Sequence, residues 1–437
     1  MKKTRVLFLL TALLQFSFAG CFSDRKNNAS DPLNNGSSQR NEIIVISDLH
    51  IGADLSYSEL NTNIKTLEKF LNNVRVSPNV KELVIAGDLL DEWFVPADVN
   101  TCNGKDQRDF VKRISETNKG VVDAFNSIIK DGNIKVTYVP GNHDLTFTPE
   151  NIDLILPGIN QARDKELGLG TYSPDDFPQL AIEHGHRYNI FCAPDMISNQ
   201  DIAPGTILPP GYFFTRIAAL HVKQKCKQNI DVIKTITPDN QGDESQQLLY
   251  AYWQIWKWSM GMLPVNNYFN EKLIITDVNG FKGTYSINDL FPFQNNPGGE
   301  IRVNLFNNIQ NSWDLRQTNN HVSVNIPVAH AIAYASSAEE LDNTAFTQYL
   351  SNPGSDKRIV VFGHNHRATI IPSFNSKGQK SIYANSGTWI DKNPAGSTAT
   401  FIIITQQDDD PSSLTKVEAY NFENEIYTQM ALNTVRL

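Results

Sequence analysis

Basic residues are scarce relative to acidic ones in this sequence. It contains 38 Lys plus Arg against 47 Asp plus Glu, which gives a formal net charge of -9 over 437 residues. Nonspecific binding to nucleic acid or to an anionic lipid surface needs a basic face, so the balance disfavours both, and we expect no nucleic-acid partner. A small phosphorylated substrate held by metal ions remains compatible with this charge.

Glycine, proline and cysteine are also too few to define a special class of protein. With 25 Gly, 21 Pro and 40% hydrophobic residues, the composition excludes disorder, collagen and coiled coil for the whole chain. No two of Cys102, Cys192 and Cys226 have the spacing of a metal site, although one pair among them could form a disulfide. The length suits two or three domains, or one elaborated domain.

The N-terminus lacks an apolar run long enough to span a bilayer. Basic residues precede the short apolar segment 6–14, and Ala19-Gly20-Cys21 resembles a bacterial lipobox. We therefore expect a signal peptide over 1–20, acylation of Cys21 and a lipid-anchored polar linker over 21–41. The mature chain would be secreted across the inner membrane and anchored as a lipoprotein of the cell envelope, in the periplasm or at the cell surface.

Hydrophobic periodicity predicts that strands and helices alternate after the linker. This β-α-β-α-β order implies parallel pairing of the strands. A capping box from Ser56 to Glu59 is expected to begin the first helix. The expected elements are a strand at 42–47, a helix at 60–74, a strand at 83–86, a helix at 110–129 and a strand at 134–139.

Later strands follow one another without room for helices, so we expect an antiparallel portion to join the parallel one. These strands are expected at 180–183, 359–362, 369–374, 381–384 and 400–405. The fold class is therefore α/β (α+β). We divide the mature chain into a catalytic domain in two parts, 42–186 and 359–437, split by a long, mostly helical insertion over 187–358.

Residues of metal-binding types follow five of the expected strands, and six of the 9 histidines lie among them. Ligands in open α/β sheets gather at the carboxyl ends of strands, so we expect these five clusters to converge. The clusters are Asp48-Leu49-His50, Gly87-Asp88-Leu89-Leu90-Asp91, Gly141-Asn142-His143-Asp144, His184-Gly185-His186 and Gly363-His364-Asn365-His366.

The spacing within two clusters predicts shared ligation. For an extended backbone, Asp48 and His50, and likewise His364 and His366, would point to one face and toward one ion. Each cluster alone is typical of a turn or a solvated loop, but five of them at strand ends favour a metal site. Imidazoles, carboxylates and one amide without a thiolate suit Mn, Fe or Zn and disfavour a structural zinc site.

In this order the motifs resemble those of the calcineurin-like metallophosphoesterases, over about 42–186 and 359–405. The resemblance implies a two-layer β-sandwich flanked by helices and a centre of two metal ions. It implies His143 as general acid and Asp91 as the residue that orients it. Either His184 or His186 could be a ligand, and motif position favours His184. The implied ligands are Asp48, His50 and His366 for one ion, Asn142, His184 and His364 for the other, and Asp88 for both.

This site predicts hydrolysis of a phosphate ester by a hydroxide that bridges two ions, with a proton supplied by His143. The segments GDLLDEW (87–93) and NSGTW (385–389) also resemble the branch that contains the UDP-diacylglucosamine hydrolases. Those enzymes carry Arg where this chain has His143 and act on the cytoplasmic side, so we favour a substrate in the cell envelope. The alternatives are a pyrophosphatase of a nucleotide, nucleotide-sugar or lipid substrate, and a noncatalytic lipoprotein that only binds.

An apolar stripe lies within the expected insertion. Its residues recur at helical spacing and are Leu249, Trp253, Trp256 and Met260. Such a stripe is typical of a helix packed in a core, which we favour. The alternative is an aromatic wall that grips the organic part of the substrate beside the metals.

Overall fold

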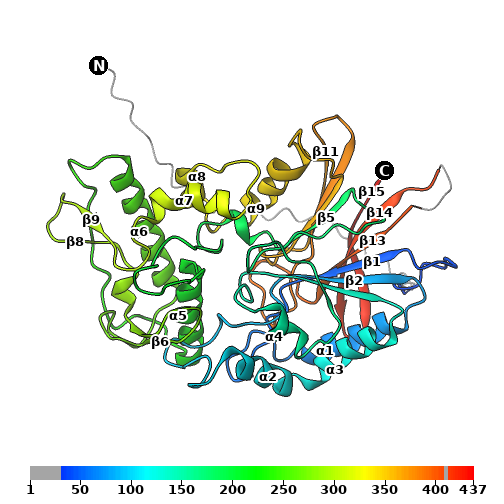
Figure 1. The fold of residues 1–437 in the computed structure, drawn as a ribbon, viewed down its shortest axis with the longest axis horizontal. Coiled ribbons are helices and arrows are strands. Elements are labelled where there is room, and N and C mark those ends of the chain that lie inside the picture. Colours follow the sequence, from blue (N-terminus) through cyan, green and yellow to red (C-terminus); the bar gives the residue numbers. More distant parts are fainter. Residues whose placement is uncertain (1–30, 408–411) are drawn as a thin grey trace.

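The computed structural model describes residues 31–407 and 412–437, in which two β-sheets pack face to face beside a large insertion (Figure 1). The predicted signal peptide and the predicted acylation site Cys21 lie outside these residues. The three described cysteines, Cys102, Cys192 and Cys226, are free thiols. Within the described ranges no helix combines the length and the apolar character that crossing a bilayer needs.

The larger sheet contains the parallel portion that the sequence predicts. Its strands are β1 (Glu42–Ile46), β2 (Val80–Ala86), β3 (Lys135–Val139), β4 (Asn160–Gln161), β13 (Thr400–Thr405), β14 (Thr415–Glu423) and β15 (Ile426–Val435). They lie in the order β15-β14-β13-β1-β2-β3-β4, parallel from β1 to β4 and antiparallel from β1 to β15. The hairpin of β14 and β15 was not predicted from the sequence.

The smaller sheet packs on one face of the larger one. Its order is β11 (Thr369–Phe374), β12 (Lys380–Asn385), β10 (Ile359–Phe362) and β5 (Leu180–Ile182). Side chains alternate along β1, so Ile43 and Val45 enter the core between the sheets while Ile44 and Ile46 face helices on the other side. The result is a β-sandwich flanked by helices, which confirms the predicted α/β (α+β) fold class.

Four helices cover the outer face of the larger sheet: α1 (Ile64–Val76), α2 (Gln107–Thr117), α3 (Lys119–Asp131) and α4 (Pro149–Asp153). The predicted capping box is wrong, because α1 begins only at Ile64. Asp391, distant in sequence, instead accepts hydrogen bonds of 2.9 to 3.1 Å from the backbone N–H groups of residues 61–63. The predicted helix 110–129 is two helices, since the chain turns at Asn118, whose side chain donates to Gly52 O.

The insertion consists of helices, two short hairpins and connecting loops, and it lies beside the sandwich in Figure 1. Its helices are α5 (Pro210–Gln224), α6 (Glu244–Met262), α7 (Ile309–Asn319), α8 (Val328–Ala333) and α9 (Ala338–Ala345). Its hairpins are β6 (Ile274–Thr276) with β7 (Gly283–Tyr285) and β8 (Phe293–Gln294) with β9 (Ile301–Arg302). Helical turns lie at η1 (His186–Tyr188), η2 (Ile287–Asp289) and η3 (Phe346–Leu350).

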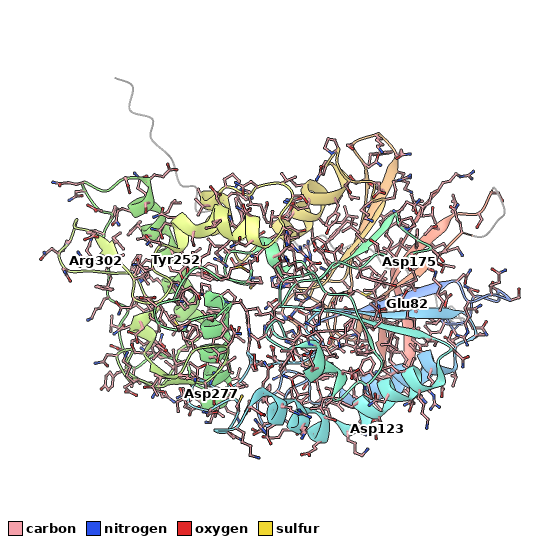
Figure 2. The ribbon with its side chains drawn as sticks, viewed as in Figure 1. Glu82, Asp123, Asp175, Tyr252, Asp277 and Arg302 are labelled. Atoms are coloured by element: carbon pink, nitrogen blue, oxygen red, sulfur yellow. The ribbon has the colours of Figure 1, made fainter. Side chains whose placement is uncertain are left out.

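The insertion has an apolar core of its own, which includes the whole predicted stripe from Leu249 to Met260. Tyr252 of α6, which Figure 2 labels, belongs to this core. The core extends to Trp93 in the sandwich, while α9 packs on the outer face of the smaller sheet. The insertion therefore contacts the sandwich both near Trp93 and along α9, and the domain limits at 187 and 358 stay a prediction.

Candidate metal centre

The five clusters of the sequence meet at one edge of the sandwich. Asp48, Asp88 and Asn142 follow β1, β2 and β3 of the larger sheet, and His184 and His364 follow β5 and β10 of the smaller one. These strands run parallel within each sheet, so their carboxyl ends lie together. Gly141 lets the loop after β3 lie directly against Asp88, because a Cβ at this position would lie 2.2 Å from Asp88 Oδ1.

The backbone of the clusters is not extended, contrary to the prediction. Asp48, His50, His364 and His366 have φ angles of 53°, 48°, 72° and 58°. The left-handed conformation costs a residue with a Cβ about 1–2 kcal/mol, so contacts around the loops must hold it. The prediction that His364 and His366 point toward one ion was wrong, since the structure places them in different groups.

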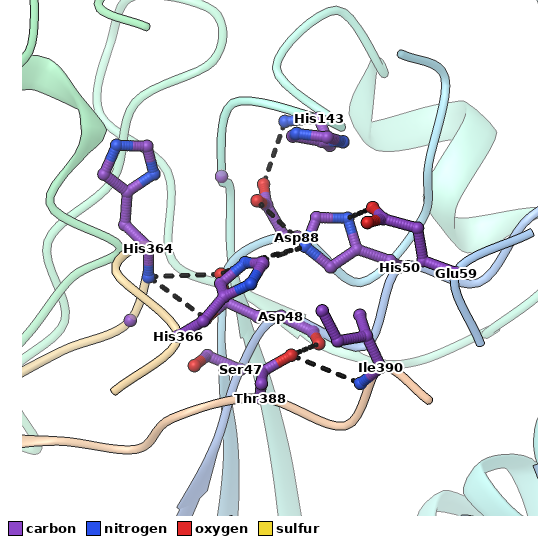
Figure 3. Close-up of polar contacts among 12 residues, drawn as sticks. Ser47, Asp48, His50, Glu59, Asp88, His143, His364, His366, Thr388 and Ile390 are labelled. Carbon is purple, nitrogen blue, oxygen red and sulfur yellow. Dashed lines mark hydrogen bonds and ion pairs between the residues drawn. The ribbon is translucent and has the colours of Figure 1, made fainter. Parts of the chain in front are cut away.

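The first group contains Asp48, His50 and His366 (Figure 3). The Nε2 atom of His366 lies 3.1 Å from Asp48 Oδ1 and 3.2 Å from His50 Nε2. His50 Nε2 in turn lies 3.9 Å from Asp48 Oδ1. Three atoms that can donate a lone pair to a cation therefore surround one point.

The second group contains Asp88, His184 and His364, with Asn142 beside it. His184 Nε2 lies 3.1 Å from both Asp88 Oδ2 and Asn142 Oδ1. The ring of His364 lies 5.0 Å from that of His184, measured between centroids. Asp88 Oδ2 is also 3.7 Å from His50 Nε2, so this carboxylate faces both groups.

His186 lies apart from both groups. Its Nε2 atom donates to Gly168 O at 2.9 Å, and its Nδ1 atom is buried without a hydrogen-bond partner. Burial, with the charge of His184, holds the pKa of His186 well below its usual value, so the ring is neutral. The structure thus brings His184, and not His186, against Asp88 and Asn142.

Hydrogen bonds behind the rings leave the Nε2 atoms free for an ion. His184 Nδ1 donates to Ala86 O at 2.8 Å, and His50 Nδ1 donates to Asp91 Oδ2 at 3.0 Å. Burial lowers the pKa of His184, but Asp88 and Asp48 raise it more, to about 9. The surroundings therefore stabilise positive charge, and a set of imidazoles, carboxylates and an amide in such surroundings fits divalent cations.

His143 stands beside these groups with its ring fixed on two sides. Nδ1 donates to Asp91 Oδ1 at 2.8 Å, and the ring stacks on Trp93 with centroids 5.0 Å apart. Burial lowers the pKa of His143, but the charges of Asp91 and Asp88 outweigh burial and raise it. The side chain is 12% exposed, so a protonated imidazole can reach solvent and a bound ligand.

Three supporting residues were missed from the sequence. Glu59, expected to cap a helix, places Oε2 3.5 Å from His50 Nδ1 (Figure 3). Thr388 Oγ1 donates to Asp48 O at 2.9 Å, and Asn393 Nδ2 donates to His366 O at 2.8 Å. Thr388 lies in the NSGTW motif, which was the one available signal.

A sandwich of two sheets whose strand ends gather imidazoles and carboxylates defines the class of metal-dependent phosphoesterases. The chain matches the calcineurin-like phosphoesterase family (Metallophos) over residues 42–368, and it belongs to that family. Members are metal-dependent hydrolases of phosphate esters and usually bind two divalent metal ions, so the chain is an enzyme of this class. A search of curated proteins gave no match.

Proposed function

We propose that the protein is a dinuclear phosphoesterase that hydrolyses a phosphate ester in the cell envelope. One observation carries the proposal. Asp88 lies between two groups of candidate ligands, 3.1 Å from His184 Nε2 and 3.7 Å from His50 Nε2. A carboxylate in this position can serve two cations at once.

The roles of the residues follow from the two groups. Asp48, His50 and His366 would hold one ion and Asn142, His184 and His364 the other, with Asp88 shared between them. When bound, two divalent ions would supply Lewis-acid stabilisation of negative charge on a phosphoryl group and activation of water.

His143 would donate the proton that the leaving alcohol needs. The carboxylate of Asp91 accepts hydrogen bonds from both His143 Nδ1 and His50 Nδ1, which leaves Nε2 of His143 to carry the proton toward the substrate. Asp91 is itself fixed by the backbone N–H groups of Trp93 and Phe94, at 2.9 and 2.7 Å. The general acid therefore keeps one orientation.

The cell-envelope location rests on the N-terminal sequence, where a signal peptide would direct secretion and acylated Cys21 would tether the mature enzyme to a membrane. The substrate would be a small phosphorylated molecule, because the chain carries a net charge of -9 and lacks the basic surplus that nucleic acid needs. His143, in place of the Arg of the UDP-diacylglucosamine hydrolases, favours an ester over a nucleotide-activated lipid.

Metal analysis combined with a substrate panel tests the proposal. The purified protein is reconstituted with Mn²⁺ or Zn²⁺ and assayed on p-nitrophenyl phosphate, bis-p-nitrophenyl phosphate and a UDP-sugar. Two ions per chain with hydrolysis of one of the esters support it. Cleavage of the UDP-sugar alone would favour the pyrophosphatase, and a metal-free, inactive protein would favour a binding module.

A further inference from the structure

The loop that carries His364 and His366 is fastened to the insertion from behind. Asn365, between the two histidines, donates Nδ2 to Asp342 Oδ1 at 2.9 Å and to Ala338 O at 3.2 Å. Arg367, which follows His366, donates Nη2 to Asp342 Oδ2. Since Asp342 and Ala338 both lie on α9, one helix of the insertion holds the loop on either side of His366.

Asp342 is itself held by the smaller sheet. The residue is 1% exposed, and Tyr383 of β12 donates its hydroxyl to Oδ1 at 2.7 Å. Asn385 at the end of the same strand donates Nδ2 to Gly363 O at 2.6 Å, which fixes the start of the loop. The carboxylate of Asp342 thus connects the loop, the strand beneath it and the insertion.

The ligand loop needs such support because its backbone is strained. His364 and His366 have φ angles of 72° and 58°, a conformation that residues with a Cβ keep only when the surroundings over-determine it. Asp48 accepts a hydrogen bond from His364 N, at 3.0 Å to Oδ2, which holds the first histidine. Asn393 holds the backbone of the second histidine through His366 O, and the residues on either side of it, Asn365 and Arg367, both donate to Asp342.

We propose that Asp342 is a positioning residue of the metal centre. Through Asn365 and Arg367 it holds the loop so that His364 and His366 face their separate groups. The inference rests on the proposed function in one respect, that these two histidines bind metal. Loss of a residue that orients metal ligands typically costs 10- to 100-fold in metal affinity, so the insertion controls affinity although it supplies no member of either ligand group.

Metal titration of the full folded chain tests this role. Metal-free wild type, Asp342→Ala and Glu339→Ala are titrated with Mn²⁺ by calorimetry, well below their unfolding temperatures. Glu339→Ala is the matched control, because Glu339 is an exposed carboxylate on the same helix. We expect wild-type affinity in the control and binding that is about 10- to 100-fold weaker in folded Asp342→Ala. The visible spectrum of the Co²⁺-loaded variant should also change.

A second variant covers the case in which Asp342→Ala fails to fold. Asn365→Ala removes the anchor of the loop and leaves Asp342 paired with Arg367 and Tyr383, and we expect a similar loss of affinity. If either variant folds, binds metal with wild-type affinity and gives an unchanged Co²⁺ spectrum, the role of Asp342 is overturned while the metal centre itself stands. Failure of the wild type to bind Mn²⁺, Zn²⁺ or Co²⁺ would instead overturn the metal centre, and the inference with it.

Discussion

The sandwich and the insertion contribute differently to the candidate centre. Every member of the two ligand groups lies on a loop of the sandwich. The insertion instead contacts those loops from outside, as Asp342 does at the loop after β10 and Arg216 does at the loop after β2. Arg216 is fully buried and donates to Val95 O, Pro96 O and Val99 O at 2.6, 3.2 and 2.5 Å.

The two regions also use buried charge differently. In the sandwich loops carboxylates meet imidazoles, and the charges of His143 and His50 lower the pKa of Asp91 although burial raises it. In the insertion, the buried carboxylate of Asp342 instead accepts a hydrogen bond from an arginine, and the buried guanidinium of Arg216 donates to backbone oxygens. The candidate metal ligands and the general acid therefore lie in the sandwich, while the insertion supplies residues that hold their loops. We expect substitutions in the sandwich loops to change metal binding and catalysis directly, and substitutions in the insertion to act through stability or loop position.

The largest effect is expected where the two ligand groups meet. Asp88→Asn keeps the size of the side chain but removes the negative charge that faces His184 and His50. We expect metal content and activity to fall together, with hydrolysis near the uncatalysed rate, as measured by elemental analysis and ester assay. Asp131→Asn, at a surface ion pair with Arg75, is the control and should retain both. Full activity of Asp88→Asn would refute the shared-ligand assignment.

The next largest effect separates proton transfer from metal binding within the sandwich. His143→Gln should retain both ions but lose about 10²- to 10⁴-fold in kcat on an alkyl phosphate, because the alkoxide then leaves without a proton. The loss should be smaller on p-nitrophenyl phosphate, whose leaving group is a weak base. Comparison of kcat for the two substrates checks this, and equal losses would show that His143 acts in another way.

The candidate metal ligands were the part of the centre that the sequence predicted best. Side chains such as Asp88 and His364 must follow strand ends to reach a shared ion, and this constraint leaves short motifs in the sequence. The parallel order of β1, β2 and β3 follows from the same local patterns. Motif position favoured His184, and the structure brings its Nε2 atom to 3.1 Å from Asp88 Oδ2.

The supporting contacts could not be predicted, because they join residues far apart in the chain. The turn that leads into α1 is held by Asp391, and the anchor of Asn365 comes from Asp342 on another element. The directions of His364 and His366 depend on left-handed backbone that tertiary contacts impose, so an argument from extended spacing failed. Buried and more exposed residues alternate along most of β14, so that strand left a signal that was missed, whereas β15 is mostly exposed or half-buried and has no buried face to predict it.

A third prediction tests whether the insertion contributes to substrate binding through its aromatic core. Trp256 is 1% exposed and packs near Phe291 and Tyr252. Trp256→Ala should cost about 3–5 kcal/mol in the free energy of unfolding and leave KM unchanged. Trp258→Ala, at a side chain that is 52% exposed, should stay within about 0.5 kcal/mol of wild type. A large rise in KM for folded Trp256→Ala would favour the aromatic wall instead.

The smallest effect is expected at a carboxylate of the sandwich loops that has neither an imidazole nor an arginine as a hydrogen-bonding partner. Glu92 is 1% exposed and accepts hydrogen bonds from Gln107 and Thr146. Burial raises the pKa of Glu92 to about 7, against the lowering effect of these bonds, from an ordinary 4.5. The folded protein therefore binds this proton more tightly than the unfolded chain does.

The sign of the pH dependence follows from that difference. Below pH 4.5 Glu92 is protonated in both the folded and the unfolded chain. As the pH rises from 4.5 to 7, the unfolded chain releases this proton first, so the free energy of unfolding falls. Above pH 7 the fall reaches its full size of about 3 kcal/mol. Glu92→Gln, which is neutral at every pH, should match wild type near pH 4 and exceed its free energy of unfolding by up to that amount at pH 8, as urea denaturation would measure. Glu116→Gln, at an exposed glutamate of α2, should instead follow wild type at both pH values. If Glu92→Gln lost stability in parallel with wild type, the carboxylate of Glu92 would be ionised in the folded protein at little cost. Glu92 would then not differ in this respect from the carboxylates of these loops that contact imidazoles.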